Sequence, residues 1–482
     1  MPLCDVIIRR AQVYDGSGGA KFSADVAVAG DCIVAVGALA DWTAARGIDA
    51  DGLALAPGFI DVHTHDDNAV LEAPGMPFKI SQGVTTIVAG NCGISAAPFT
   101  FCEGLPPPFT LGMADPDRAF PTVAAYRQAV ERAKPVVNVA LLAGHSSLRA
   151  TVMKTDLDRP ARADEVAAMA ALLETALQDG AIGLSSGLDY PPALAAPMAE
   201  IVALAEVLAA YPNSIYTTHM RDEGNEVEAA LRESLDTARM AGARLVISHH
   251  KCAGISNFGK SVSTLAMIDK AAKGQTVGLD VYPYTASSSA LIERFLPAAD
   301  DILVNWSVPH PEMSGRMLND IADEWGIDRG EACRRLHPAG AIYFDMAEDD
   351  LRRIMAYPAT MIGSDGIPGT EKPHPRLWGT FPRVLGHFAR DQGVIPLETA
   401  IHKMTGLSAA NFGFDDRGLV RPQMKADLVL FDPEKVIDRA TFDDPERPAE
   451  GIAQVWVNGV EALADGVLTG KRAGVFLPRK AA

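Results

Sequence analysis

Six side chains that could bind a metal ion each follow a short apolar run of the sequence. They are His63, His65, Cys92, His219, His249 and Asp365. If the first run is a β-strand, the His-x-His pair points both imidazoles to one face, because strand side chains alternate. Imidazole and thiolate ligands favour zinc over magnesium or calcium. The residue types therefore predict a zinc site, provided that the ends of the runs converge.

Each of these residue types also has a purely structural interpretation. A lone strand-end histidine such as His145 is usually a hydrogen-bonded structural residue, and a lone cysteine is usually a small core residue. An aspartate before a glycine, such as Asp365, can simply form a turn. The combination favours a metal site, because independent accidents would not keep placing ligands at the same end of successive strands.

The elements that would position these residues alternate between two kinds. Short apolar runs typical of buried strands occupy residues 59–61, 84–89, 137–143, 181–184, 215–218, 245–248, 277–282 and 360–363. Between them lie stretches with apolar residues at helical spacing, such as 161–178, 226–240 and 261–273. Eight strands alternating with helices predict an α/β fold, a (β/α)8 barrel of the TIM type, over residues 57–414. Active sites of such barrels lie at the carboxyl ends of the strands, where the six candidate ligands fall.

Two regions depart from this alternation. The step from Val277 to Thr360 is 83 residues, and the excess predicts a helical subdomain inserted after strand seven, at residues 285–358. Short strand-like runs with turns occupy the two ends of the chain. Neither end can close a core well alone, so residues 1–56 and 415–482 are expected to form one small β-sandwich-like domain.

Composition excludes several classes of partner. The 482 residues include 43 lysines and arginines against 61 acidic residues, a net charge of −18 without any basic run. This argues against nucleic acid and anionic membranes as partners. No apolar run approaches the roughly 18 residues of a membrane span. The six cysteines lack CxxC spacing and the N-terminus lacks a signal-like apolar stretch, which favours the cytoplasm.

The motifs around the candidate ligands resemble those of a known family. Ala-Pro-Gly-Phe-Ile-Asp-Val-His-Thr-His-Asp-Asp occupies residues 56–67, and Gly-Asn-Cys-Gly-Ile-Ser occupies 90–95. Further matches lie at 81–86, 218–223, 248–251, 363–366, 373–379, 426–431 and 455–459. The chain resembles the N-acyl-D-amino-acid deacylases (D-aminoacylases) of the amidohydrolase superfamily over essentially its whole length. Asn-Cys-Gly is the specific marker, since many binuclear relatives use a carboxylated lysine where this subgroup uses cysteine.

The resemblance implies zinc-dependent hydrolysis of small N-acyl-D-amino acids. Cys92, His219 and His249 would hold one tight zinc ion, and His63, His65 and Asp365 would frame a weaker second position. Asp365 would also take a proton from water and pass one to the leaving amine. The substrate carboxylate would be bound by Lys251, Tyr282, Ser288, Arg376 and Tyr190. An arginine suits this role, because its planar guanidinium binds carboxylates bidentately.

Other functions stay open at this point. Residues 254–261 match the phosphate-loop pattern GxxxxGK[ST], although a polar stretch separates them from the preceding run. Cys92 could be a nucleophile with a histidine as its base. Another reaction of the superfamily, such as cyclic-amide or dipeptide hydrolysis or deamination, is a third possibility, and metal storage is a fourth.

The side-chain preference of the substrate depends on Arg294. Some members of the family resembled carry an arginine where this chain has Phe295, which would suit a D-glutamate side chain. Here the arginine is displaced by one residue and follows Glu293, which could neutralise it. The expectation is a preference for neutral, apolar side chains, with N-acyl-D-glutamate as the alternative.

Overall fold

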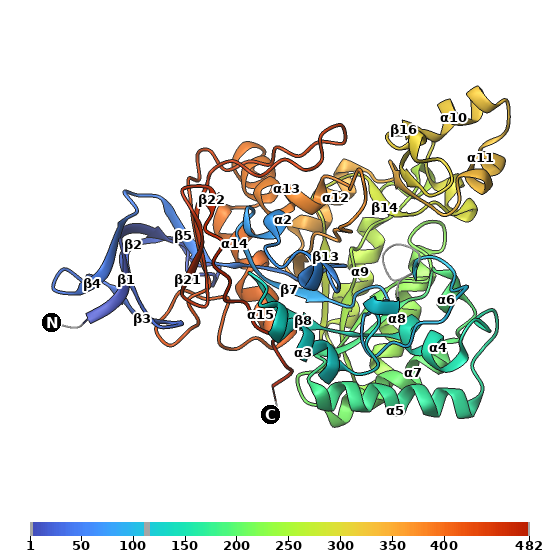
Figure 1. Ribbon diagram of the computed structural model, residues 1–482, viewed down its shortest axis with the longest axis horizontal. Helices are drawn as coiled ribbons and strands as arrows, with labels where there is room; N and C mark the ends of the chain where they lie inside the picture. Colours follow the sequence, from blue (N-terminus) through green and yellow to red (C-terminus); the bar gives the residue numbers. More distant parts are fainter. Residues whose placement is uncertain (1–2, 110–115, 481–482) are drawn as a thin grey trace.

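The computed structural model describes residues 3–109 and 116–480, and an eight-stranded parallel barrel lies at its centre (Figure 1). Its strands are β6 (Phe59–Asp61), β7 (Val84–Ala89), β8 (Asn138–Leu141), continued by β9 (Ala143–Gly144), β10 (Gly183–Gly187), β11 (Ile215–His219), β12 (Arg244–Ile247), β13 (Val277–Val281) and β18 (Thr360–Ile362). Neighbouring strands pair in parallel, in the order β6-β7-β8 and β9-β10-β11-β12-β13-β18. The parallel bridge between Thr64 and Gly366 joins the last strand to the first. The predicted barrel is confirmed.

The barrel strands could be predicted from the sequence because both of their faces are buried. Every residue of β7, β10, β11 and β13 is buried. Strands covered by helices on one face and packed inside a barrel on the other carry continuous apolar runs rather than an alternating pattern.

Helices surround the barrel, on the outer face of its strands and at the rim of its carboxyl end (Figure 1). They are α1 (Ala69–Glu72), α2 (Pro77–Ile80), α3 (Val123–Ala133), α4 (His145–Met153), α5 (Ala163–Asp179), α6 (Pro191–Leu194), α7 (Met198–Ala205), α8 (Val227–Ala241), α9 (Ser261–Ala271), α12 (Glu348–Ala356), α13 (Arg376–Arg383), α14 (Leu397–Met404) and α15 (Gly406–Phe412). The helical stretches expected around 161–178, 226–240 and 261–273 correspond to α5, α8 and α9. Within the described residues, no helix has the length and apolar character needed to cross a membrane.

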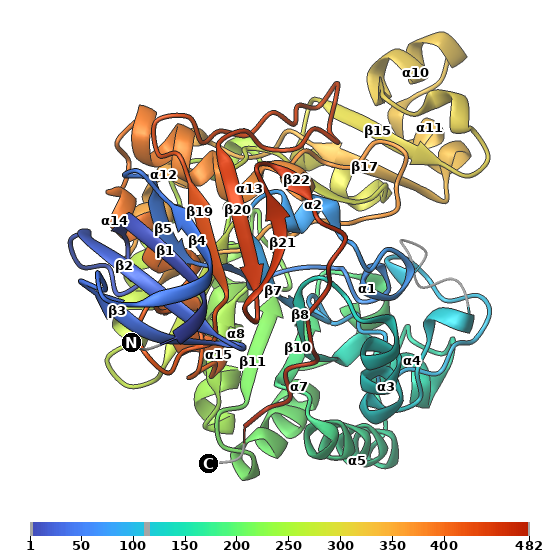
Figure 2. The ribbon, with the colours of Figure 1, turned by 60° about the vertical axis from the view of Figure 1, so that its left-hand side comes forward.

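Strands from both ends of the chain form one nine-stranded sheet. It contains β1 (Leu3–Val13), β2 (Phe22–Ala29), β3 (Cys32–Gly37), β4 (Thr43–Asp49), β5 (Ala54–Pro57), β19 (Leu428–Phe431), β20 (Ile452–Val457), β21 (Val460–Ala464) and β22 (Val467–Leu468). The two ends meet where β5 pairs with β19 in antiparallel register, Leu55 opposite Leu430. Figure 2 shows the blue N-terminal strands beside the red C-terminal ones.

The segment inserted between β13 and β18 differs from the helical subdomain that we expected. It carries the four-stranded antiparallel sheet β14 (Ser287–Ala290), β17 (Ala339–Tyr343), β15 (Ile302–Ser307) and β16 (Arg316–Met317), together with helices α10 (Leu318–Trp325) and α11 (Arg329–Leu336). The sheet was missed because β14 reads Ser-Ser-Ser-Ala, which has no strand pattern, and pairs with a strand about 50 residues away. The segment has its own apolar core and projects at the upper right of Figure 1.

Candidate metal centre and active site

The backbone at three of the candidate ligands is in the left-handed region, which non-glycine residues seldom adopt. Cys92, His249 and Asp365 have φ angles of 51°, 35° and 50°. Each lies two or three residues beyond the end of its strand, β7, β12 or β18. Gly187, at the end of β10, permits the close approach of the Cys92 backbone, because a Cβ atom there would lie 2.1 Å from the carbonyl oxygen of Cys92. Strain of this kind is characteristic of functional sites.

The predicted metal ligands lie together at the carboxyl end of the barrel. Cys92 Sγ is 3.2 Å from His63 Nε2 and 3.3 Å from His249 Nε2. His249 Nε2 is in turn 3.0 Å from His219 Nδ1. Single donor atoms of His63, Cys92, His249 and Asp365 all lie within 4.8 Å of one another. Atoms at these separations can bind a common cation.

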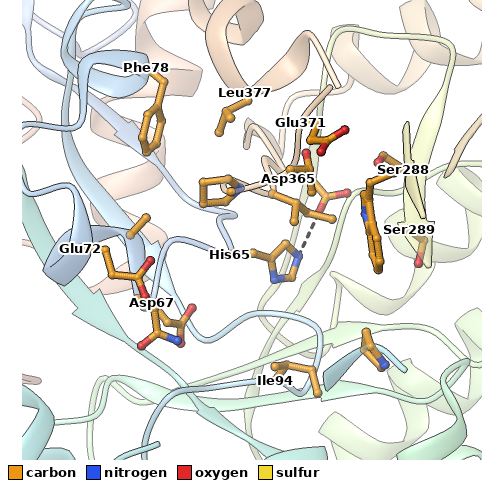
Figure 3. A pocket seen from close by; sticks show the side chains of 18 of the residues that line it. His65, Asp67, Glu72, Phe78, Ile94, Ser288, Ser289, Asp365, Glu371 and Leu377 are labelled. Carbon is orange, nitrogen blue, oxygen red and sulfur yellow. Dashed lines mark hydrogen bonds and ion pairs between the residues drawn. The ribbon is translucent and has the colours of Figure 1, made fainter. Parts of the chain in front are cut away.

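Asp365 connects the remaining ligand to this cluster. Its Oδ1 atom is 3.1 Å from His65 Nε2 and 3.5 Å from His63 Nε2. The contact with His65 is the dashed line in Figure 3. The Oδ2 atom of Asp365 is 2.8 Å from Arg376 Nη1. Burial alone would raise the pKa of this carboxyl, but the Arg376 guanidinium and the neighbouring histidines hold it well below its usual range. Asp365 is therefore ionised and can accept a proton.

The electrostatics of the cluster favour a bound cation. Burial lowers histidine pKa values, yet Asp280 and Cys92 raise the pKa of His63 well above normal, and Asp365 and Cys92 raise that of His65 to about 9. Burial also opposes ionisation of the Cys92 thiol, but the surrounding histidines lower its pKa well below the usual value. Without a metal ion, the thiolate and the neighbouring carboxylates therefore favour the protonated forms of His63 and His65. A divalent cation can supply that positive charge instead and leave neutral imidazoles as ligands.

Two acidic residues that we did not predict orient the histidines. Asp280 lies on β13, and its Oδ2 atom is 3.4 Å from His63 Nδ1. Its Oδ1 atom accepts a hydrogen bond of 2.9 Å from the backbone N–H of His249. Glu223 Oε1 is 2.9 Å from His249 Nδ1, and its Oε2 is 2.6 Å from Lys251 Nζ. Carboxylates of this kind commonly fix the orientation of metal-binding histidines. A signal for Asp280 existed, since it is the one charged residue in the apolar run 277–282.

The five side chains expected to bind the substrate carboxylate surround the same cluster. Lys251 Nζ and Arg376 Cζ lie 5.7 and 4.5 Å from the centre of the Tyr282 ring, so both cations contact its face. Arg376 Nη2 donates to the carbonyl of Ser288 at 3.2 Å. The Tyr190 ring lies 4.6 Å from that of His219.

Two cavities open at the centre. One of about 840 Å³ is lined by His65 and Asp365, and Figure 3 shows both at its middle. The other, of about 590 Å³, is lined by His219, His249 and Lys251. Both volumes suit small-molecule binding.

Comparison with known proteins decides the family. The family model described as "Amidohydrolase family" matches residues 46–284 and 316–462. The chain belongs to this family. A D-aminoacylase of Alcaligenes xylosoxydans xylosoxydans is 48% identical over 480 residues, covering 99% of this chain and 98% of the relative. From the same organism, an N-acyl-D-glutamate deacylase is 46% identical (94% and 93% covered) and an N-acyl-D-aspartate deacylase 48% identical (97% and 93% covered).

Solved structures agree with this assignment to the amidohydrolases. A D-aminoacylase studied for its binuclear metal centre superposes with a TM-score of 0.96 at 49% identity, covering 99% of this chain and 100% of that one. The N-acyl-D-glutamate deacylase of Bordetella bronchiseptica, complexed with zinc and a phosphonate that mimics the tetrahedral intermediate, gives 0.94 at 45% identity with the same coverage. The resemblance inferred from the motifs is confirmed.

The environment of Arg294 differs from our expectation in this amidohydrolase. Glu293 does not neutralise it, because Glu293 Oε1 is 2.7 Å from Arg334 Nη1 instead. Arg294 pairs with Asp189, donating to both its carboxylate and its carbonyl oxygen. Phe295 lines the 590 Å³ cavity and packs edge-to-face against Tyr190, at 6.4 Å between ring centres.

The segment that matches a phosphate loop has its donors occupied within the protein. The backbone N–H of Gly259 and the hydroxyl of Ser261 both donate to the Asp350 carboxylate, and Lys260 Nζ donates to the carbonyl of Asn225 at 3.0 Å. A carboxylate therefore lies where a phosphate group would have to bind. The nucleotide-binding alternative has no support here.

His145 is a structural residue, as a lone strand-end histidine usually is. It is fully buried, and its Nε2 lies 2.9 Å from Glu200 Oε1. Arg149 Nη1 contacts the same oxygen at 2.6 Å.

Proposed function

We propose that the protein is a zinc-dependent hydrolase of N-acyl-D-amino acids, which releases a carboxylate and a free D-amino acid. The observation that carries this proposal is the convergence of Cys92, His219 and His249 beside the ionised Asp365. The close relatives named D-aminoacylase, N-acyl-D-glutamate deacylase and N-acyl-D-aspartate deacylase support the D configuration of the substrate.

The donor set fits zinc, which takes thiolate and imidazole ligands in tetrahedral sites. Cys92, His219 and His249 would hold the tight ion, and His63, His65 and Asp365 would frame a weaker second position. A zinc ion bound there supplies Lewis-acid polarisation of the amide carbonyl and lowers the pKa of a water molecule towards about 7.

Asp365 is the acid–base residue in this proposal. Its carboxylate accepts the proton of the attacking water and then passes a proton to the nitrogen of the leaving amine. The contact with Arg376 keeps the carboxylate ionised, and the contacts with His63 and His65 fix its direction.

Lys251, Tyr282, Ser288, Arg376 and Tyr190 would bind the substrate carboxylate. Lys251 lines the 590 Å³ cavity and its side chain is only 4% exposed. Arg376 is fully buried, and its Nε donor makes no hydrogen bond within the described residues. Arg376 also contacts Asp365, which lines both cavities, and a buried donor without a partner is suited to an anionic ligand.

A panel of N-acetyl-D- and N-acetyl-L-amino acids tests the proposal, with the zinc content of the protein measured on the same sample. We expect hydrolysis of D-substrates by zinc-containing protein. Hydrolysis of L-substrates alone, or of cyclic amides instead, would contradict it.

We also propose a cytoplasmic location. The six cysteines are all free thiols, as expected in a reducing compartment.

A further inference from the structure

The two cavities meet at the metal cluster. Tyr190, Ser288, Ser289 and Asp365 line both of them. In Figure 3, Asp365 stands between His65 and the pair Ser288 and Ser289, with the 840 Å³ cavity around them. When a substrate bond is cleaved beside Asp365, the parts of the substrate on either side of that bond can therefore occupy one cavity each.

The charges of the linings assign the substrate carboxylate to one cavity. The 590 Å³ cavity is lined by two cations, Lys251 and Arg294, and by carboxylates that include their ion-pair partners Glu223 and Asp189. Among the described residues that line the 840 Å³ cavity, Arg118 is the one arginine or lysine, and its Nε lies 2.8 Å from Glu72 Oε1. Lys251 is buried at the cluster, with its side chain 4% exposed and Nζ 2.9 Å from His249 Nδ1, whereas the Arg118 side chain is 36% exposed. A carboxylate buried away from water needs a cation close by, so it belongs in the cavity that contains Lys251.

Amide geometry then assigns the acyl group. The amide of the substrate is planar and trans, so the acyl chain and the α-carbon leave the scissile bond in opposite directions. The α-carbon carries both the carboxylate and the side chain, and both therefore lie on the Lys251 side. We propose that the 840 Å³ cavity is the acyl-binding chamber and that it selects bulky apolar acyl groups over acetyl. This inference rests on the proposed function.

The walls of the acyl-binding chamber suit a large apolar group. Phe78 and Trp378 form an edge-to-face pair with ring centres 6.1 Å apart, and Leu377, Ile94 and Trp306 extend the apolar surface. Figure 3 places Phe78 and Leu377 on one side of His65 and Ile94 on the other. Cavities of about 300–1,000 Å³ hold whole drug-sized ligands, so an acetyl group would leave most of this one unfilled.

Acidic residues at the same chamber argue against an anionic acyl group. Glu371 and Glu446 line it, besides Glu72. A second carboxylate on the acyl chain, as in a succinyl group, would be repelled there. The predicted order of acyl preference is therefore hexanoyl and phenylacetyl first, acetyl next and succinyl last.

The test is a series of N-acyl-D-methionines that differ only in the acyl group, assayed with zinc-containing protein. We expect kcat/KM for N-hexanoyl-D-methionine to exceed that for the acetyl compound by about tenfold or more, the scale on which apolar pockets discriminate. Hexanoate should also inhibit more strongly than acetate. If the acetyl substrate is preferred over the hexanoyl substrate, the selectivity proposed for the acyl-binding chamber is wrong, whereas the proposed function is unaffected. If no N-acyl-D-methionine is hydrolysed, the proposed function itself fails.

A variant that fills the acyl-binding chamber tests where the acyl group binds. Ala69 lines the cavity from α1 and is half-buried, so Ala69→Trp adds a large side chain there. We expect the hexanoyl-to-acetyl ratio of kcat/KM to fall to about one. The matched control is Ala209→Trp, because Ala209 is exposed and outside both linings. A ratio that is unchanged in Ala69→Trp, with zinc still bound, would place the acyl group elsewhere.

Discussion

In the proposed function, single residues at the strand ends carry the chemistry, and His249 is the most connected of them. Its Nε2 lies near both Cys92 Sγ and His219 Nδ1, while its Nδ1 faces Glu223. We predict that His249→Ala loses bound zinc and hydrolysis together, because only two of three ligands for the tight ion remain. The matched control is His250→Gln, since His250 contacts the Thr264 hydroxyl and no predicted metal ligand. Full zinc occupancy in His249→Ala, measured by metal analysis, would contradict the assignment.

Asp365 is expected to affect catalysis more than metal binding. Asp365→Asn keeps the size of the side chain but removes the proton acceptor, so we predict a loss of kcat of at least about a hundredfold. The tight zinc should stay bound, because its three proposed ligands are untouched. Steady-state kinetics and zinc analysis of one preparation check both statements. Near-normal turnover would show that another group moves the proton.

The ion pair between Arg294 and Asp189 is expected to set the side-chain preference. With its charge balanced, Arg294 should favour neutral, apolar side chains such as that of N-acetyl-D-methionine. Asp189→Asn removes the balancing charge, and we predict that kcat/KM for N-acetyl-D-glutamate relative to the methionine compound rises about tenfold. If N-acetyl-D-glutamate is already the best substrate of the unmodified protein, this explanation is wrong.

The sequence revealed residues with distinctive chemistry and missed those whose role depends on position. Histidines and a cysteine at run ends indicate metal binding by their type. Glu223 and Asp280 are ordinary acidic residues until folding brings them within 2.9 and 3.4 Å of histidine nitrogens. The pairing of Arg294 with Asp189, 105 positions away, was unpredictable for the same reason.

At the scale of elements, Glu200 joins two helices by a buried ion pair. From α7 it contacts His145 and Arg149, both on α4. Burial alone would raise its pKa, but these partners lower it to about 2. A carboxyl with a lowered folded-state pKa stabilises the fold above its unfolded pKa, and that stability is lost as the pH falls towards 2.

Glu200→Gln should therefore lower the free energy of unfolding at pH 7 by about 3 kcal/mol. This is the equivalent of a carboxyl pKa that is lowered from 4.5 to about 2 on folding. The deficit should shrink between pH 4.5 and 2, where the carboxylate of the unmodified protein becomes protonated. Urea unfolding of both proteins at several pH values measures this. A deficit that does not change with pH would mean that packing, and not charge, is responsible.

Helices and strands could be predicted from the sequence where their own residues show the burial of the element. The barrel strands were found because both of their faces are covered, which leaves continuous apolar runs. The sheet of the inserted segment was not found, because its pairing joins Ser287–Ala290 to Ala339–Tyr343 across α10 and α11. Such long-range pairing leaves no periodic signal in either partner.

At the scale of the whole molecule, the barrel brings ligands from distant parts of the chain to one site. Cys92 and Asp365 are separated by 273 positions, and closure of the barrel between Thr64 and Gly366 brings both to the same rim. The rim joins the proposed metal ligands, the proposed acid–base residue Asp365 and two cavities, and that combination leads to the proposed hydrolysis.

The most direct test is a zinc titration of metal-free protein with N-acetyl-D-methionine as substrate. We predict no hydrolysis before zinc is added and a rise that saturates near one zinc ion per chain, with the L enantiomer unhydrolysed throughout. Full activity of the metal-free protein, abolished by iodoacetamide, would contradict the account and favour Cys92 as a nucleophile.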